Sequence, residues 1–237
     1  MPEKKGNIID TTEKRSRILG LAFLIQFVTS ITSGVVVLPL ATGIPGLGLL
    51  ENIGQTMANI ARNAGLIHLD ILLGLVTAAG VIFLGAMLYS ALREQNEGLA
   101  LTAFGLYVLE GALIAVAKLG LFALLVHSQQ SISAGSPVSL EPTARMIYEA
   151  MSYSSKMFNL TFCLGGTIFY ALLLRARTVP WPLSLWGLVS AQGVFAGVLL
   201  GLFGVKAPIF LYVLYIPFEL VIAVWILIRG VKTETAN

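Results

Sequence analysis

Long apolar segments alternate with short polar connections along this chain. A membrane-spanning α-helix needs about 20 mostly apolar residues, and six segments reach that length. They predict an all-α polytopic membrane protein, a six-helix bundle that forms one domain over residues 17–230. The predicted spans cover residues 17–41, 67–92, 98–127, 146–174, 181–204 and 208–229. A basic tail over residues 1–16, predicted to be disordered, and a short tail over residues 231–237 flank them.

Composition supports the membrane assignment. Hydrophobic residues make up 57% of the chain and charged residues 11%, whereas soluble domains carry about 25% charged residues. The first span follows a basic run at residues 14–17 and so resembles a signal peptide. Its apolar part is too long for one and no small-residue cleavage site follows, so we expect an uncleaved anchor.

The basic residues predict the orientation. Most of the 15 Lys and Arg residues flank the span ends on the side of the two termini, and only Arg62, Arg145 and Lys206 fall on the opposite side. The positive-inside rule then places both termini in the cytoplasm. The net charge of +3 arises from these basic residues at the span ends, which contact the headgroups of the lipid bilayer. No nucleic-acid partner is expected.

The segment between the first two spans has the pattern of a short amphipathic helix. Apolar and polar side chains alternate at helical spacing, and Pro45, Gly46 and Gly65 are expected to bound the helix. Such a helix lies on the membrane surface or covers an outer cavity as a lid. The pattern leaves both roles open.

Two charges interrupt the third span. Glu110 falls near the bilayer centre and Lys118 lies about 12 Å further out, about 80° around the helix. They share a broad face without direct contact, so each needs a partner on another helix. Asp70, at the outer end of the second span, is within reach of Lys118 and suggests a structural ion pair.

The other spans supply polar groups at the depth of Glu110. Lys156 and Asn159 lie on a polar stripe of the fourth span, and Glu219 follows Pro217, which is expected to kink the sixth. Gln26 and Gln192 complete the set. With Asp70, Glu110 and Glu219 against two lysines, we expect interior pairing and a proton on the excess carboxylate.

Several further chemistries are open to these residues. A serine at 152 or 155 activated by Lys156 would suggest an intramembrane enzyme, but no catalytic motif accompanies them, and we expect no enzyme. His68 and His127 are weak candidates for haem or metal ligands, because no second metal-binding motif reinforces them. We therefore expect no cofactor and no metal site. The single Cys163 forms no intrachain disulfide.

A ridge of glycines marks the fifth span. Gly193, Gly197 and Gly201 recur every four residues, a small-xxx-small pattern that lets another helix approach closely. The partner helix belongs to this chain or to another subunit. An internal contact is favoured, and a homo- or hetero-oligomer is the alternative.

Three stretches carry a resemblance to a known family: RILGLAFLIQFVTSITSG, FNLTFCLGGTIFYALLLRARTVPWPLSLWGL and FELVIAVWILIRGVK. They resemble the bacterial membrane proteins grouped as domain of unknown function 4386. The residues that match its pattern are Arg175, Arg177, Pro180, Leu183, Gly187, Glu219, Trp225 and Gly230. The resemblance implies a six-span protein of the bacterial inner membrane and brings no activity, while Lys118 and Lys156 lie outside the pattern.

The leading functional hypothesis is a small carrier or binding protein for a small or lipophilic solute, linked to protons. Glu110, Lys156, Asn159 and Glu219 would surround its central site, with Gln26 and Gln192 as further candidates. The rival hypothesis is an accessory or scaffold protein whose buried charges only fix helix packing. A haem- or metal-binding membrane protein is the third.

Overall fold

The computed structural model describes residues 3–44, 52–133 and 140–230. Every regular element within these ranges is helical. In chain order they are α1 (Glu3–Ile31), the π-helix η1 (Thr32–Val37), α2 (Leu38–Thr42), α3 (Ile53–Arg62), α4 (Ala64–Leu92), α5 (Glu97–Ser133), α6 (Glu141–Ala176), α7 (Trp181–Leu202), α8 (Phe210–Val213) and α9 (Tyr215–Arg229).

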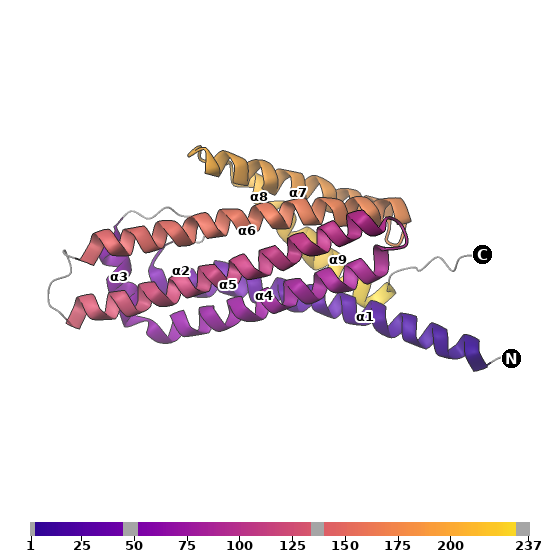
Figure 1. Ribbon diagram of the computed structural model, residues 1–237, viewed down its shortest axis with the longest axis horizontal. Helices are drawn as coiled ribbons and strands as arrows, with labels where there is room; N and C mark the ends of the chain where they lie inside the picture. The colour runs from indigo at the N-terminus through magenta and orange to yellow at the C-terminus, as the bar shows by residue number, and fades with distance from the viewer. Residues whose placement is uncertain (1–2, 45–51, 134–139, 231–237) are drawn as a thin grey trace. The chain divides into compact units, whose positions relative to one another are not determined.

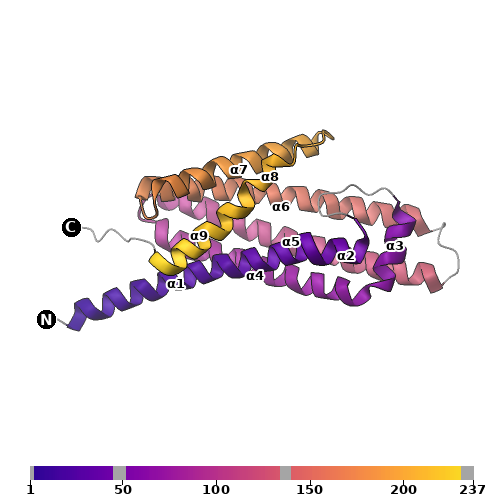
Figure 2. The same ribbon diagram turned by 180° about the vertical axis from the view of Figure 1, so that it is seen from behind.

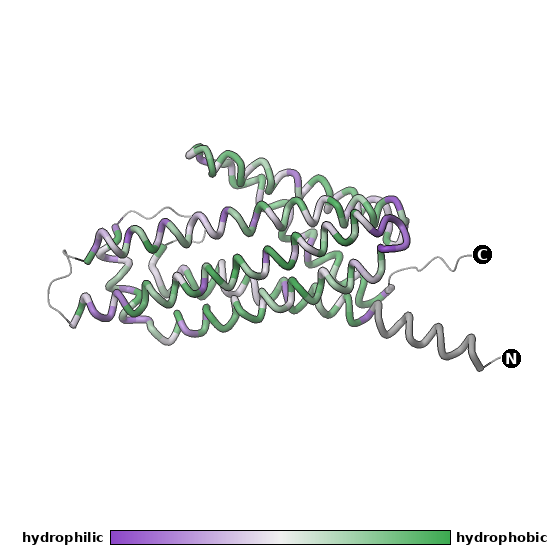
Figure 3. The backbone as a smooth tube through the Cα atoms, in the orientation of Figure 1, coloured by the Kyte–Doolittle hydropathy of each residue, from purple (hydrophilic) through white to green (hydrophobic). Residues whose placement is uncertain are grey.

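Six helical segments are long and apolar enough to cross a membrane, which confirms the predicted fold class. They are Arg17–Thr42, Ala64–Leu92, Glu97–Ser133, Glu141–Ala176, Trp181–Leu202 and Phe210–Arg229. Apolar residues predominate along the long helices and polar residues gather near their ends (Figure 3).

The helices extend beyond several predicted limits. The helix of the first span begins at Glu3, although the sequence predicted a disordered tail there, because lengthening an existing helix requires no new nucleation. α5 continues to Ser133, six residues past the predicted end of its span at 127. Ser128 and Ser133 donate to the carbonyls of Leu124 and Gln129 in the preceding turn, so both residues belong to the helical extension.

The chain divides into two compact units, and α1, α4, α5 and α6 contribute residues to both. Unit 1 comprises residues 1–27, 80–110 and 159–237, and unit 2 comprises residues 28–79 and 111–158. The candidate polar groups therefore fall into two sets, which are described separately below.

Unit 2 contains the short amphipathic helix α3 (Figure 1). Asn52 caps it by accepting a hydrogen bond from the Gln55 amide at 3.0 Å, a favoured way to satisfy a first-turn N–H. Met57 and Ile60 are buried in the core of this unit. The expected start at Pro45 and Gly46 lies outside the described residues. The helix ends at Arg62 rather than at Gly65, which belongs to α4.

In unit 1, α7 and α9 pack against each other and α9 runs toward α1 (Figure 2). Close approaches between helices occur where glycines leave room: a Cβ on Gly187 would meet the Phe218 ring, and a Cβ on Gly20 would meet the Leu227 backbone. The short connection between α4 and α5 also brings these two helices together. Tyr89 of α4 stacks on Phe104 of α5 at a centroid distance of 6.1 Å.

The glycine ridge of α7 is largely covered from within the chain. A Cβ on Gly193 would lie 3.1 Å from the Leu211 carbonyl oxygen, and one on Gly197 would lie 2.7 Å from the Tyr212 ring. Gly201 has no such neighbour within 4 Å. Two of the three glycines thus serve an internal contact with α8, and an oligomer through this ridge stays a prediction.

The sixth span is broken close to Pro217. α8 ends at Val213 and α9 begins at Tyr215, with Leu214 between them. Proline has no N–H to donate to the carbonyl four residues earlier and its ring clashes there. The Leu214 carbonyl at the break accepts hydrogen bonds from Trp186 Nε1 at 3.2 Å and from Ser190 Oγ at 3.4 Å, both on α7.

Candidate functional site

Two buried carboxyl groups come together in unit 1. Glu110 of α5 is 4% exposed and Glu219 of α9 is 7% exposed. The two carboxyls are close enough to interact electrostatically. We call this pair the carboxyl site. Both residues are predicted from the sequence to lie at one depth in the membrane, and their role as a joint binding site stays a prediction.

Each carboxyl shares a helix face with a tyrosine. Tyr107 precedes Glu110 by three residues on α5, and Tyr215 precedes Glu219 by four on α9, so each pair projects from one side of its helix. Both tyrosines are buried and both interact electrostatically with Glu219. The helix break at Leu214 makes Tyr215 the first residue of α9. Tyr215 and Glu219 therefore lie on the first two turns of the same helix.

Aromatic rings wall the carboxyl site. Tyr170 and Tyr215 share a hydrogen bond of 2.8 Å between their hydroxyls. Edge-on contacts join Tyr107 to Phe169 at 5.2 Å and Tyr170 to Phe218 at 5.1 Å between centroids, a favourable geometry for aromatic pairs. These aromatic residues were not predicted from the sequence, although a tyrosine stands about one helical turn before each glutamate.

The two carboxyls differ in their hydrogen bonds. The Gln26 side chain of α1 hydrogen-bonds the Glu219 carboxyl, and its role at the site stays a prediction. Glu110 Oε2 is buried and has no hydrogen-bond partner among the described residues. In the same part of the chain, no lysine or arginine forms an ion pair with either carboxyl. Unsatisfied buried polar atoms are costly and therefore rare.

The other predicted members, Lys156, Asn159 and Gln192, belong to α6 and α7. Lys156 belongs to unit 2, where its Nζ lies over the Tyr153 ring at 4.5 Å from the centroid. Gln192 is exposed on α7 and donates to Thr167 Oγ1 at 2.6 Å. Asn159 is half-buried in unit 1.

A second buried polar cluster lies in unit 2. Lys118 Nζ donates to Asp70 Oδ2 at 2.5 Å and to Ser33 Oγ at 3.1 Å, while Ser33 donates to Asp70 Oδ1 at 2.6 Å. Asp70 is fully buried and Ser33 is 6% exposed. We call these three residues the ion-pair site. It contains the Asp70–Lys118 contact expected from the sequence, and Ser33 is its unforeseen member.

Helix geometry makes room for the ion-pair site. Ser33 lies in η1, whose wider turn is marked by the Leu38 N–H bonding to the Ser33 carbonyl five residues earlier. Gly74 of α4 lies against the Lys118 stem, because a Cβ there would overlap the aliphatic carbons. The side chains of Ser33, Asp70 and Lys118 all hydrogen-bond within this site.

The two histidines lie in unit 2 without forming a recognisable metal site. His68 is exposed, and His127 Nε2 lies 2.9 Å from the Leu140 carbonyl oxygen. Within the described ranges, no three His, Cys, Asp or Glu residues form a group that could hold a metal ion.

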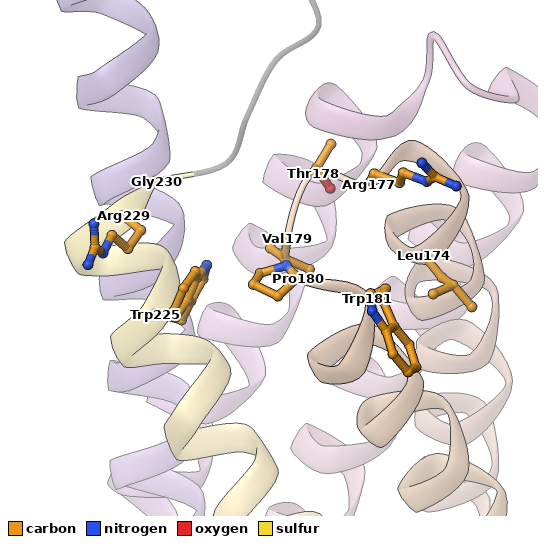
Figure 4. A pocket seen from close by; sticks show the side chains of 9 residues that line it. All are labelled: Leu174, Arg177, Thr178, Val179, Pro180, Trp181, Trp225, Arg229 and Gly230. Carbon is orange, nitrogen blue, oxygen red and sulfur yellow. The ribbon is translucent and has the colours of Figure 1, made fainter.

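Comparison with known proteins assigns the chain to a family. The profile of domain of unknown function 4386 matches residues 18–230. The chain belongs to this family. In this DUF4386 member, four residues of the resemblance noted above line one pocket (Figure 4): Arg177, Pro180, Trp225 and Gly230. No curated protein and no solved structure matches the chain.

Proposed function

We propose that this membrane protein is a proton-linked carrier or binding protein for a small or lipophilic solute, with the carboxyl site as its binding centre. The observation that carries the proposal is a pair of buried glutamates, one of which has an unpartnered oxygen. Ionisable groups inside membrane spans are expensive, and they mark ion, proton or substrate sites.

The chemistry of the site favours exchange between a proton and a cation. Two carboxylates facing each other in a low-dielectric interior repel, so a proton or another positive charge between them is stabilising. Aromatic faces such as those of Tyr107 and Tyr215 also attract cations. Among small or lipophilic solutes, an organic cation therefore fits best, and the broken sixth span resembles the discontinuous helices found at transporter sites.

Proton release on ligand addition tests this function. Tetraphenylphosphonium is added to the purified protein in weakly buffered detergent solution, and tetraphenylborate, of similar shape and opposite charge, is the control ligand. The cation is expected to release protons and the anion is not. Glu110→Gln and Glu219→Gln should abolish the release, whereas Glu97→Gln, an exposed glutamate on α5, should retain it. Full release from both folded site variants would refute the proposal.

The scaffold hypothesis also has a specific observation in its favour. Gln26 and the Tyr170–Tyr215 pair connect α1, α6 and α9 through buried hydrogen bonds, which would fix helix packing without any solute. In that case Glu110→Gln and Glu219→Gln would lower the melting temperature, and the wild-type protein would release no protons with either ligand. A stoichiometric partner on copurification would support it further.

A further inference from the structure

A small pocket lies in unit 2, beside the amphipathic helix α3. It has a volume of about 130 Å³, close to that of an engineered protein cavity of about 150 Å³ that binds benzene. α3 contributes Thr56 and Ile60 to the lining, and the other lining residues come from η1, α2, α5, α6 and the residue Ile44. α3 therefore forms one wall of a cavity, as expected for a helix that covers one.

Two asparagine side chains hold α3 beside this pocket. Asn59 Nδ2 donates to the Thr42 carbonyl at 3.1 Å, and Asn63 Nδ2 donates to the Ala41 carbonyl at 3.4 Å. Both carbonyls belong to the last turn of α2, where the helix itself supplies no N–H partner. Gly43 ends α2 with φ of 75°, and a Cβ there would lie 2.5 Å from Asn59 Nδ2. The glycine therefore leaves room for the contact that fixes α3 in place.

The lining is apolar apart from three hydroxyl groups. Leu121 and Ile60 are lining residues that are almost fully buried, and no described lining residue carries a charge. The hydroxyl groups are those of Thr42, Thr56 and Tyr148. A charged ligand would lose its hydration here without gaining a counter-charge. The pocket therefore favours a neutral molecule that is mostly apolar.

The two threonines differ in what they can offer a ligand. Thr42 Oγ1 donates to the Leu38 carbonyl at 2.8 Å and accepts from the Ile44 N–H at 3.2 Å, so only one lone pair is left. Thr56 is 5% exposed, and its hydroxyl makes no hydrogen bond to another described residue. This hydroxyl can both donate and accept. A ligand hydroxyl could bond to either threonine, whereas a ligand carbonyl could not use Thr42.

We propose that this pocket binds a small lipophilic alcohol or phenol, with the ligand hydroxyl on Thr56 and the hydrocarbon part against Leu121 and Leu124. The volume limits the ligand to about the size of one six-membered ring. A buried hydroxyl without a partner is costly, and the ligand supplies that partner. The pocket shares no residue with the carboxyl site, so this proposal is independent of the carrier function.

Fluorine NMR tests the proposal with 4-fluorophenol as the probe. The full-length protein in detergent micelles is titrated with the probe, and protein-free micelles correct for partitioning. 4-Fluorotoluene, in which a methyl group replaces the hydroxyl, is the control ligand. We expect both ligands to bind at one saturable site per chain.

The Thr56→Val variant separates the hydrogen bond from the apolar contacts, because valine keeps the shape of threonine and lacks the hydroxyl. It should weaken 4-fluorophenol binding about three- to tenfold, the usual effect of one neutral hydrogen bond, and leave 4-fluorotoluene binding unchanged. Thr102→Val, at an exposed threonine of α5, is the matched control and should change neither affinity. Thr56→Phe, whose ring would occupy the pocket, should abolish saturable binding of both ligands.

Three results would overturn the proposal. Binding to the wild type that never saturates would show partitioning into the micelle only. Unchanged 4-fluorophenol affinity in folded Thr56→Val would remove the hydroxyl from the site. Equal weakening of both ligands by Thr56→Val would show an apolar cavity without preference for an alcohol. If Thr56→Phe has no cooperative melting transition and so does not fold, the comparison of the two ligands in Thr56→Val decides alone.

Discussion

The carboxyl site and the ion-pair site show two ways of burying charge in membrane-spanning helices. At the ion-pair site, Asp70 meets Lys118 and Ser33, and the polar groups satisfy one another. At the carboxyl site, two groups that carry the same charge when ionised approach each other, and Glu110 Oε2 has no hydrogen-bond partner among the described residues. The first arrangement is suited to stability, and the second leaves capacity for a proton or ligand.

Because of this difference, substitutions at the ion-pair site should mainly lower stability, whereas substitutions at the carboxyl site should mainly change ligand binding. Removing one member of a buried ion pair leaves an uncompensated charge, which is strongly destabilising. At the carboxyl site, replacing Glu110, whose Oε2 has no hydrogen-bond partner among the described residues, removes one of two like charges instead. The following experiments compare the sites on that basis, beginning with the largest expected change in stability.

Lys118→Met should cause the largest loss of stability. It leaves the fully buried Asp70 carboxylate with only Ser33, and breaking such a pair costs about 3–5 kcal/mol of unfolding free energy. Denaturant titration in detergent micelles measures this loss. The double variant Asp70→Leu/Lys118→Met should recover most of it, because no charge remains buried. A loss below about 1 kcal/mol in the single variant would show that the pair does not hold the helices.

Gly165→Ala should have an intermediate effect at the aromatic wall. The added Cβ would lie 2.8 Å from Tyr107 Cδ2 and 3.2 Å from the Ala103 carbonyl oxygen. Overpacking of this kind costs roughly 1–3 kcal/mol, and it should also weaken binding of tetraphenylphosphonium. Gly105→Ala on α5 is the control, since a Cβ there has open space and alanine favours a helix by up to about 1 kcal/mol. If the two variants had equal melting temperatures, the Tyr107 side chain would be able to move aside for the added methyl group at no cost in stability.

Glu110→Gln should change stability least, by less than about 1 kcal/mol, because its Oε2 makes no hydrogen bond that could be lost. The amide can instead donate to the Glu219 carboxyl. The unfolding free energy is compared with that of Glu97→Gln, while proton release reports function. A loss as large as that of Lys118→Met would make Glu110 a structural group and contradict the contrast between the sites.

The sequence predicted the fold well because membrane spans depend mainly on length and apolarity. It also predicted the contact between Asp70 and Lys118, since depth along a helix follows directly from residue number. Depth alone does not give the rotation of each helix. Lys156 and Gln192 were therefore grouped with Glu110, whereas their described contacts are with Tyr153 and Thr167.

Other features depend on packing that no single helix specifies. The π-helix that contains Ser33 changes the face this residue presents, and no local pattern predicted the change. The aromatic wall draws on α5, α6 and α9, which meet only after folding. Pro217 did predict a distortion of the sixth span, because the loss of a backbone donor is a local property.

A solute can bind at the carboxyl site only if that site becomes accessible, so we expect it to open in the folded protein while the ion-pair site stays closed. Cys163 is the only cysteine, is fully buried and interacts electrostatically with Glu110, so its thiol reports opening there. Ser33→Cys in a Cys163→Ala background reports the ion-pair site. Labelling by a small methanethiosulfonate is compared with the global unfolding rate under native conditions. We predict that Cys163 reacts much faster than unfolding and is protected by tetraphenylphosphonium, while the thiol at position 33 reacts only at the unfolding rate. Labelling of both thiols at the unfolding rate would contradict the account and make the carboxyl site a closed part of the core.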